Sequence, residues 1–128
     1  MCKGMSIDEC VELADNFIRN QGMCLLCFDV KNSRGFKDSK ELVKRLNHMM
    51  NDINQNFANY FPEQCLANYV RVEKGFQTLL GDGSWAGINS SEIIPKIIEY
   101  QKNKYSNIPL YWGVARDGFD CERIKLLR

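Results

Sequence analysis

The chain has 128 residues, of which 45% are apolar and 26% are charged, and its net charge is +1. This composition is typical of one globular domain over residues 1–128, long enough to bury about two thirds of its unfolded surface. The balanced charge excludes a global attraction to nucleic acid or to an anionic membrane. No apolar run reaches the roughly 20 residues that span a bilayer, and residues 1–6 lack the pattern of a signal peptide. We therefore expect a cytoplasmic protein without a nucleic-acid or membrane partner.

Capping residues followed by apolar positions at steps of three and four predict three helices. A capping box at residues 6–9 begins the first helix, and Gly22 supplies its stop. A second capping signature at residues 38–41 begins a long helix that Pro62 ends. Pro95 is tolerated in the third helix because it falls in the first turn. The predicted helices cover about residues 7–20, about residues 39–60, and a segment capped by Asn89 or Ser91 that carries Ile93 to Tyr105.

Short runs of large apolar and β-branched residues predict the strands. A tight turn at residues 73–75 is expected to join two of them as a hairpin, and residues 81–84 are expected to form a loop. The dipeptide Asp117-Gly118 is a second hairpin signal, after which the chain returns as an edge strand. The predicted strands cover residues 23–30, 66–72, 76–80 and 110–115, with an edge strand within 119–127.

Without the first helix, the predicted order is β-α-β-β-α-β. This order is typical of the ferredoxin-like α+β fold, in which helices cover one face of an antiparallel sheet. The first helix is then an N-terminal addition, and residues 119–127 add a C-terminal edge strand. Because this fold serves many functions, the fold alone predicts none of them.

The six cysteines give little support to a metal or redox site. Only Cys24 and Cys27 are closely spaced, and residues three apart on a strand point to opposite faces. The single histidine, His48, lies within the long helix and is expected to be solvated. We expect buried, reduced thiols.

The strongest functional signal is a carboxylate near the end of the first strand. Asp29 is followed by a polar loop with Asn32, Ser33 and Arg34 that leads into a helix, a layout typical of phosphate and metal sites. The loop amides could bind an anion, and the Arg34 guanidinium suits phosphate and carboxylate equally well. Asp29 could also simply cap the loop, with Arg34 as its ion-pair partner and the loop as an ordinary turn.

Three segments together resemble the SatD family. They are Phe28-Asp29-Val30-x-x-Ser33-Arg34, the long helix with Leu46-Asn47 and Ile53-Asn54-x-x-Phe57, and Gly75-Phe76-Gln77-Thr78-Leu79-Leu80. The layout is also similar to that of class III nucleotidyl cyclases. The resemblance implies a palm-like domain in which a first Asp and a later Gly-Asp bind two Mg²⁺ ions, and in which domains assemble in pairs.

The chain departs from this family pattern at the second metal position. Lys74 stands where the pattern has an aspartate, and its ammonium would repel Mg²⁺ but could contact a phosphate. Glu73 is one residue away and points to the other face of a strand. A rival register places residues 81–83 at the hairpin tip, with Asp82 as the second carboxylate.

Three functions stay open on these grounds. The first is a regulatory module that has lost catalysis and binds a nucleotide or phosphate through Asp29, Asn32, Ser33, Arg34 and Lys74. The second is an Mg²⁺-dependent nucleotidyl enzyme with Asp29 and either Asp82 or Glu73 as metal ligands. The third is a homodimeric interaction module without a small ligand. We favour the first, with no catalytic residue assigned and Mg²⁺ as an optional cofactor.

Overall fold

The computed structural model describes residues 5–31, 39–62, 64–67, 70–76, 83–116 and 125–127. The helices and strands are α1 Ile7–Gln21, β1 Cys24–Val30, α2 Ser39–Asn56, the short 3-10 helix η2 Ala58–Tyr60, β2 Gln64–Ala67, β3 Val70–Glu73, β4 Gly83–Ile88, α3 Ile93–Lys104, β5 Leu110–Ala115 and β6 Lys125–Leu127. The fold is α+β, as predicted. Within the described residues, no helix combines the length and the apolarity needed to cross a membrane.

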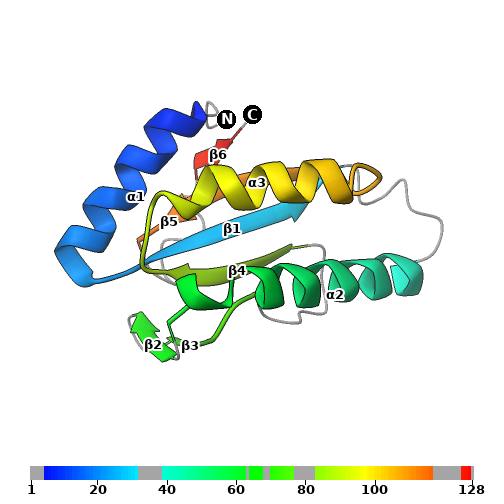
Figure 1. Ribbon diagram of the computed structural model, residues 1–128, viewed down its shortest axis with the longest axis horizontal. Helices are drawn as coiled ribbons and strands as arrows, with labels where there is room; N and C mark the ends of the chain where they lie inside the picture. The colour runs from blue at the N-terminus through cyan, green and yellow to red at the C-terminus, as the bar shows by residue number, and fades with distance from the viewer. Residues whose placement is uncertain are drawn as a thin grey trace.

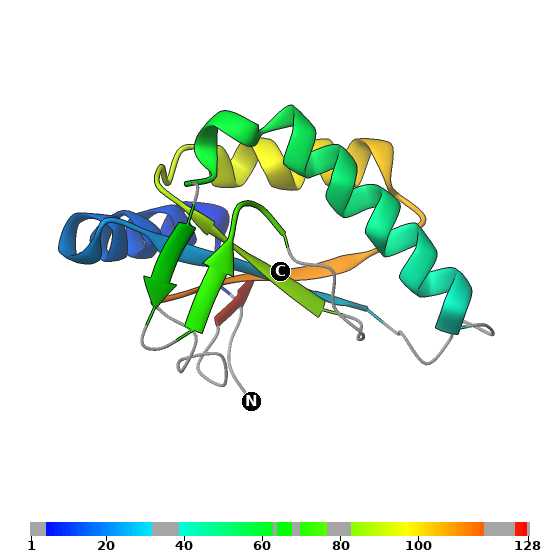
Figure 2. The same ribbon diagram turned by 90° about the horizontal axis from the view of Figure 1, so that it is seen from below.

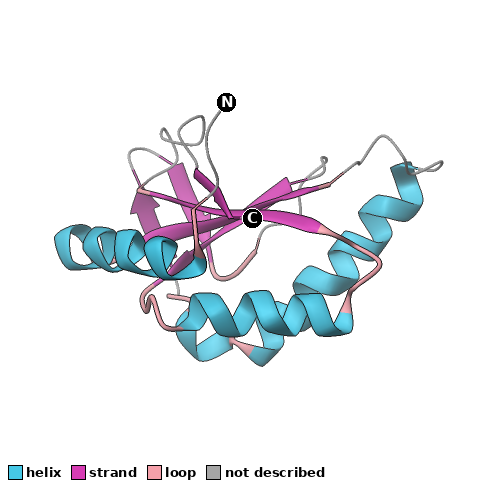
Figure 3. Ribbon diagram, turned by 90° about the horizontal axis from the view of Figure 1, so that it is seen from above, coloured by secondary structure: helices cyan, strands magenta, loops and turns pink. Residues whose placement is uncertain are grey.

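The main sheet has four strands in the order β4-β1-β5-β6, and each neighbouring pair is antiparallel. The three helices lie over one face of this sheet (Figure 1; Figure 3). The strand β1 occupies the centre of the fold, because it pairs with both β4 and β5. The predicted C-terminal edge strand is confirmed by β6, which pairs with β5.

The side chains of β1 alternate between two apolar clusters. Cys24, Leu26 and Phe28 belong to the large core between the sheet and the helices. Leu25 and Cys27 belong to a smaller cluster on the other face. The alternation confirms that Cys24 and Cys27 point to opposite faces, as the strand period requires. Both cysteines are buried and reduced, as is Cys10; the side chains of the other three cysteines lie outside the described residues.

Helix α1 begins and ends where the capping residues predict. The Ser6 side chain accepts a hydrogen bond from the Glu9 backbone N–H at 3.1 Å, and the Glu9 carboxylate accepts from the Ser6 backbone N–H. Gly22 ends the helix in the left-handed conformation, with φ of 88°. Its backbone N–H donates to the carbonyl of Ile18. Local chemistry therefore fixes this helix.

The region between α2 and α3 differs from the predicted hairpin. The predicted strand over residues 66–72 is two short strands, β2 and β3, which pair with each other in a separate two-stranded sheet (Figure 2). The strand next to β1 is β4, which starts at Gly83 within the predicted loop. The predicted return strand at 77–80 lies outside the described residues. The fold is thus compatible with a ferredoxin-like arrangement but is not a complete βαββαβ sheet.

The chain turns at residues 73–75, and the residue that follows the turn is buried. Gly75 adopts φ of 83°, so the chain does turn there. Phe76 then enters the core, where its ring lies 5.4 Å from Phe28, 6.0 Å from Phe61 and 6.2 Å from Trp112, centroid to centroid. Burial of this aromatic side chain anchors the chain directly after the turn.

Candidate functional site

Asp29 lies on the face of the sheet that the helices leave open. Six of the seven residues of β1 are buried, and Asp29 is the exposed one. In the antiparallel ladders, its cross-strand neighbours are Gly83 on β4 and Tyr111 on β5. The prediction that the 73–75 turn lies opposite Asp29 is therefore wrong at the level of strand pairing. The register instead brings Gly83, the residue after Asp82, beside it.

Gly83 makes room for the Asp29 side chain. A Cβ atom at position 83 would collide with Oδ1 of Asp29, and it would lie 2.9 Å from the carbonyl oxygen of Phe28. The carboxylate can therefore lie across the start of β4 only because residue 83 has no side chain.

Tyr111 and Lys31 lie on the same part of the sheet as Asp29. Tyr111 is 40% exposed, and the Lys31 ammonium lies 4.9 Å from the centre of its ring. The Lys31 backbone N–H donates to the carbonyl of Pro109 at 2.8 Å, which holds the end of β1 against the start of β5. We call Asp29, Lys31, Gly83 and Tyr111 the sheet-end group. It brings together an exposed acceptor, an exposed aromatic ring and a partly exposed cation.

The remaining predicted site residues are only partly placed. Asn32, Ser33, Arg34 and Asp82 lie outside the described residues, so their roles stay predictions. Lys74 is described and exposed, directly after β3. Within the described part of the chain, no three His, Cys, Asp or Glu side chains are grouped to hold a metal ion. His48 is exposed on α2, as predicted.

Two segments that carry the family resemblance meet in the structure. The Asn54 side chain on α2 accepts a hydrogen bond from the backbone N–H of Phe76 at 2.7 Å, and it donates to the carbonyl of Phe76 at 3.1 Å. A Cβ atom on Gly75 would lie 2.5 Å from the Asn54 amide oxygen. The Asn54 amide thus holds the Gly75-Phe76 turn, which gives this part of the motif a structural role.

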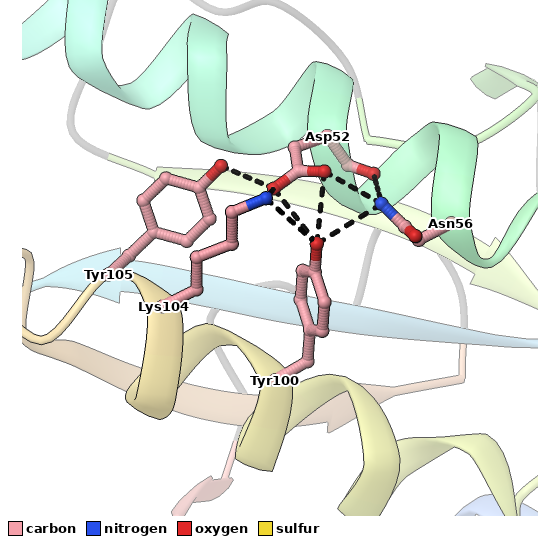
Figure 4. Close-up of polar contacts among 5 residues, drawn as sticks. All are labelled: Asp52, Asn56, Tyr100, Lys104 and Tyr105. Carbon is pink, nitrogen blue, oxygen red and sulfur yellow. Dashed lines mark hydrogen bonds and ion pairs between the residues drawn. The ribbon is translucent and has the colours of Figure 1, made fainter.

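A second carboxylate, Asp52, lies in a polar cluster between α2 and the C-terminal end of α3 (Figure 4). It accepts hydrogen bonds from Tyr100 at 3.0 Å, Tyr105 at 2.5 Å and Asn56 at 2.7 Å. It also forms an ion pair with Lys104 at 2.7 Å. Sequence reasoning missed this cluster, although pairs spaced by four residues, Asp52 with Asn56 and Tyr100 with Lys104, were visible signals.

The cluster shifts the titration of its members. Burial alone would raise the pKa of Asp52, but hydrogen bonds from Lys104, Tyr105 and Tyr100 lower it overall. Burial, followed by the hydrogen bond to Asp52, raises the pKa of Tyr105 to about 12. The hydrogen bonds to Asp52 and Tyr100 raise the pKa of Lys104. Asp52 therefore stays charged and occupied by donors, which suits a structural role better than proton transfer.

Comparison of the chain with protein-family models, with curated proteins and with solved structures gave no match.

Proposed function

We propose that this chain is a non-catalytic binding module that holds a small nucleotide-like phosphorylated ligand at the sheet-end group. The observation that carries the proposal is the exposed Asp29 carboxylate beside an exposed aromatic ring and a lysine ammonium. A nucleotide has partners for all three, since its sugar hydroxyls can donate to a carboxylate, its base can stack, and its phosphate attracts an ammonium.

The absence of catalysis is proposed from the residues next to Asp29. Its two cross-strand neighbours are a glycine and a tyrosine, neither of which is a metal ligand of the required kind. Mg²⁺ sites generally need more than one carboxylate together with the substrate phosphates.

Calorimetric titration with ATP, GTP and AMP, each with and without Mg²⁺, tests the proposal. We expect binding without Mg²⁺ that weakens about tenfold in Tyr111→Ala, because stacking on an aromatic side chain contributes about 1–3 kcal/mol. Tyr60→Ala is the matched control, since Tyr60 is 38% exposed and lies on η2, away from the sheet-end group. No heat for any nucleotide, or equal losses in both tyrosine variants, would reject the proposal.

One observation favours a second candidate, an Mg²⁺-dependent nucleotidyl enzyme. Strand β4 begins at Gly83, so Asp82 directly precedes the residue that pairs with Asp29. This candidate predicts a product from ATP or GTP that disappears in both Asp29→Asn and Asp82→Asn. A product that survives Asp82→Asn, or no product at all, would exclude this pair of carboxylates as the metal ligands.

A further inference from the structure

A groove lies on the helix side of the sheet, between the first turns of α2 and the loop from α3 to β5. Its volume is about 320 Å³, and its walls include Glu41, Lys44, Arg45, His48, Tyr105 and Asn107. A smaller cavity of about 180 Å³ adjoins it, since both are lined by Tyr105 and Ile108. A groove of this size is in the range that takes a small organic ligand.

Positive charge dominates the lining of both spaces. The described lining of the groove has two cations, Lys44 and Arg45, and one carboxylate, Glu41, which pairs with the Nε atom of Arg45 at 3.1 Å. Among the residues that the structure describes, Lys44 has no acidic partner. The smaller cavity adds Lys31 and Lys102, and none of the described residues that line it is acidic. The whole chain carries a net charge of only +1, so these cations are a local concentration.

The wall shared by the two spaces, Tyr105 and Ile108, is fixed by hydrogen bonds to residues outside the groove. Gln101, which is 1% exposed, donates hydrogen bonds to the carbonyls of Ile108 at 2.7 Å and Tyr105 at 3.4 Å. The Tyr105 hydroxyl is fixed by Asp52, whose carboxylate is already taken up by its donors (Figure 4). A wall fixed before binding lowers the entropy that a ligand must overcome.

We propose that this groove binds the phosphate ester of a small organic molecule, with the phosphate at Lys44 and Arg45 and the organic part against Tyr105 and Ile108. The fork of Arg45 and the ammonium of Lys44 are the donor types that suit a phosphate dianion. The groove does not depend on the proposed function, because none of the sheet-end residues lines it; only the adjoining cavity shares Lys31 with them.

The test uses glucose 6-phosphate, glucose and inorganic phosphate, followed by calorimetry and by backbone amide shifts in NMR spectra. We expect glucose 6-phosphate to shift the amides of Lys44, Tyr105 and Asn107, and glucose to shift none of them. Lys44→Gln and Arg45→Gln should each weaken binding about tenfold, since a hydrogen bond to a charged group contributes about that factor.

The chain offers a matched control for the charge change. Arg19 on α1 pairs with Asp15 at 2.8 Å with the same four-residue spacing as Arg45 and Glu41, and it does not line the groove. Arg19→Gln should leave binding unchanged. Glu41→Gln should tighten binding, because Glu41 is the carboxylate among the described residues that line the groove, whereas Asp15→Asn should not.

Several results would overturn the proposal. They are an absence of shifts at the groove, shifts confined to the sheet-end group, or losses in Arg19→Gln equal to those in Arg45→Gln, which would mean unspecific attraction. Inorganic phosphate that binds as tightly as glucose 6-phosphate would overturn the assignment of an organic ester. The exposed positions of Lys44 and Arg45 allow the variants to fold, and their unchanged melting temperatures would verify this.

Discussion

Gly22 and Gly75 share a left-handed backbone conformation but differ in what surrounds them. Their φ angles are 88° and 83°. A Cβ atom on Gly22 would meet nothing within 4 Å, whereas one on Gly75 would collide with the Asn54 side chain. A substitution at Gly22 therefore introduces backbone strain alone, whereas one at Gly75 introduces backbone strain and also disturbs the contact with Asn54.

We expect Gly22→Ala to lower the free energy of unfolding by about 1–2 kcal/mol, the strain of a left-handed alanine. Gly75→Ala should lower it by about 2–4 kcal/mol, because the two hydrogen bonds between Asn54 and Phe76 are also disturbed. Urea unfolding of both variants measures the difference. In Asn54→Ala, the added Gly75→Ala change should cost about as little as Gly22→Ala, and full additivity would contradict a shared contact.

The candidate site could be predicted in part from single residues. The exposed Asp29 at the end of a buried strand was visible, because a carboxylate within an apolar run has few other places to go. Its neighbours Gly83 and Tyr111 were not, because the register between distant strands is decided by packing of the whole sheet and not by local sequence.

At the scale of secondary structure, the cluster around Asp52 joins α2 to the end of α3. Of its members, only Tyr105 belongs to a predicted apolar face, because the cluster lies where the two helices meet at the surface of the core. The shifts in pKa of its members tie the contact between the helices to pH. The contribution of Asp52 to stability changes at acidic pH, and that of Tyr105 changes at alkaline pH.

The stability that Tyr105 contributes should be lost at high pH. Its pKa is raised from 10.0 to about 12 in the folded state, so its contribution is complete below pH 10 and disappears as the pH rises to about 12. At pH 8, the free energy of unfolding of the wild type should exceed that of Tyr105→Phe by about 1 kcal/mol, which is the usual contribution of a hydrogen bond. Urea unfolding at pH 8 to 12 measures the difference, and a constant difference across this range would contradict the mechanism.

The stability that Asp52 contributes should be lost at low pH instead of at high pH. Because its folded pKa is lowered, its contribution is present above the unfolded pKa of about 4 and is lost as the pH falls below that value. The difference in stability between wild type and Asp52→Asn should therefore shrink between pH 5 and pH 2. A difference that grows on acidification would show that the carboxylate is not stabilised in its charged form.

The strands show why the helices were easier to predict. Helix α1 follows from its capping box and its apolar spacing alone, which are local signals. Strand β4 has the sequence Gly-Ser-Trp-Ala-Gly-Ile, whose small residues hide the alternation typical of a strand. Gly83 is required by the Asp29 side chain. The contact with Asp29 requires a glycine at position 83, and this glycine weakens the strand pattern in the sequence of β4.

At the scale of the whole molecule, one apolar core joins the sheet to all three helices. Cys10 on α1 and Cys24 on β1 both belong to it, and each is 0% exposed. Burial raises the pKa of the Cys10 thiol to about 11 and that of the Cys24 thiol to about 12. Because the thiolate is the reactive form, both thiols should be inert until the core opens.

We therefore expect Cys10 and Cys24 to react with iodoacetamide at pH 8 only through global unfolding, and at the same rate. Gly75→Ala lies far from both in sequence, yet it should accelerate both reactions about thirtyfold for each 2 kcal/mol of lost stability.

Mass spectrometry with fragmentation distinguishes Cys24 from Cys27, and alkylation in urea gives the unprotected rates. If Cys10 reacts faster than Cys24 and its rate is the same in Gly75→Ala, then α1 detaches by itself. Only a local opening of α1 would be independent of the stability of the sheet and the other helices. Equal rates that follow the stability would instead establish that the N-terminal helix unfolds together with the sheet.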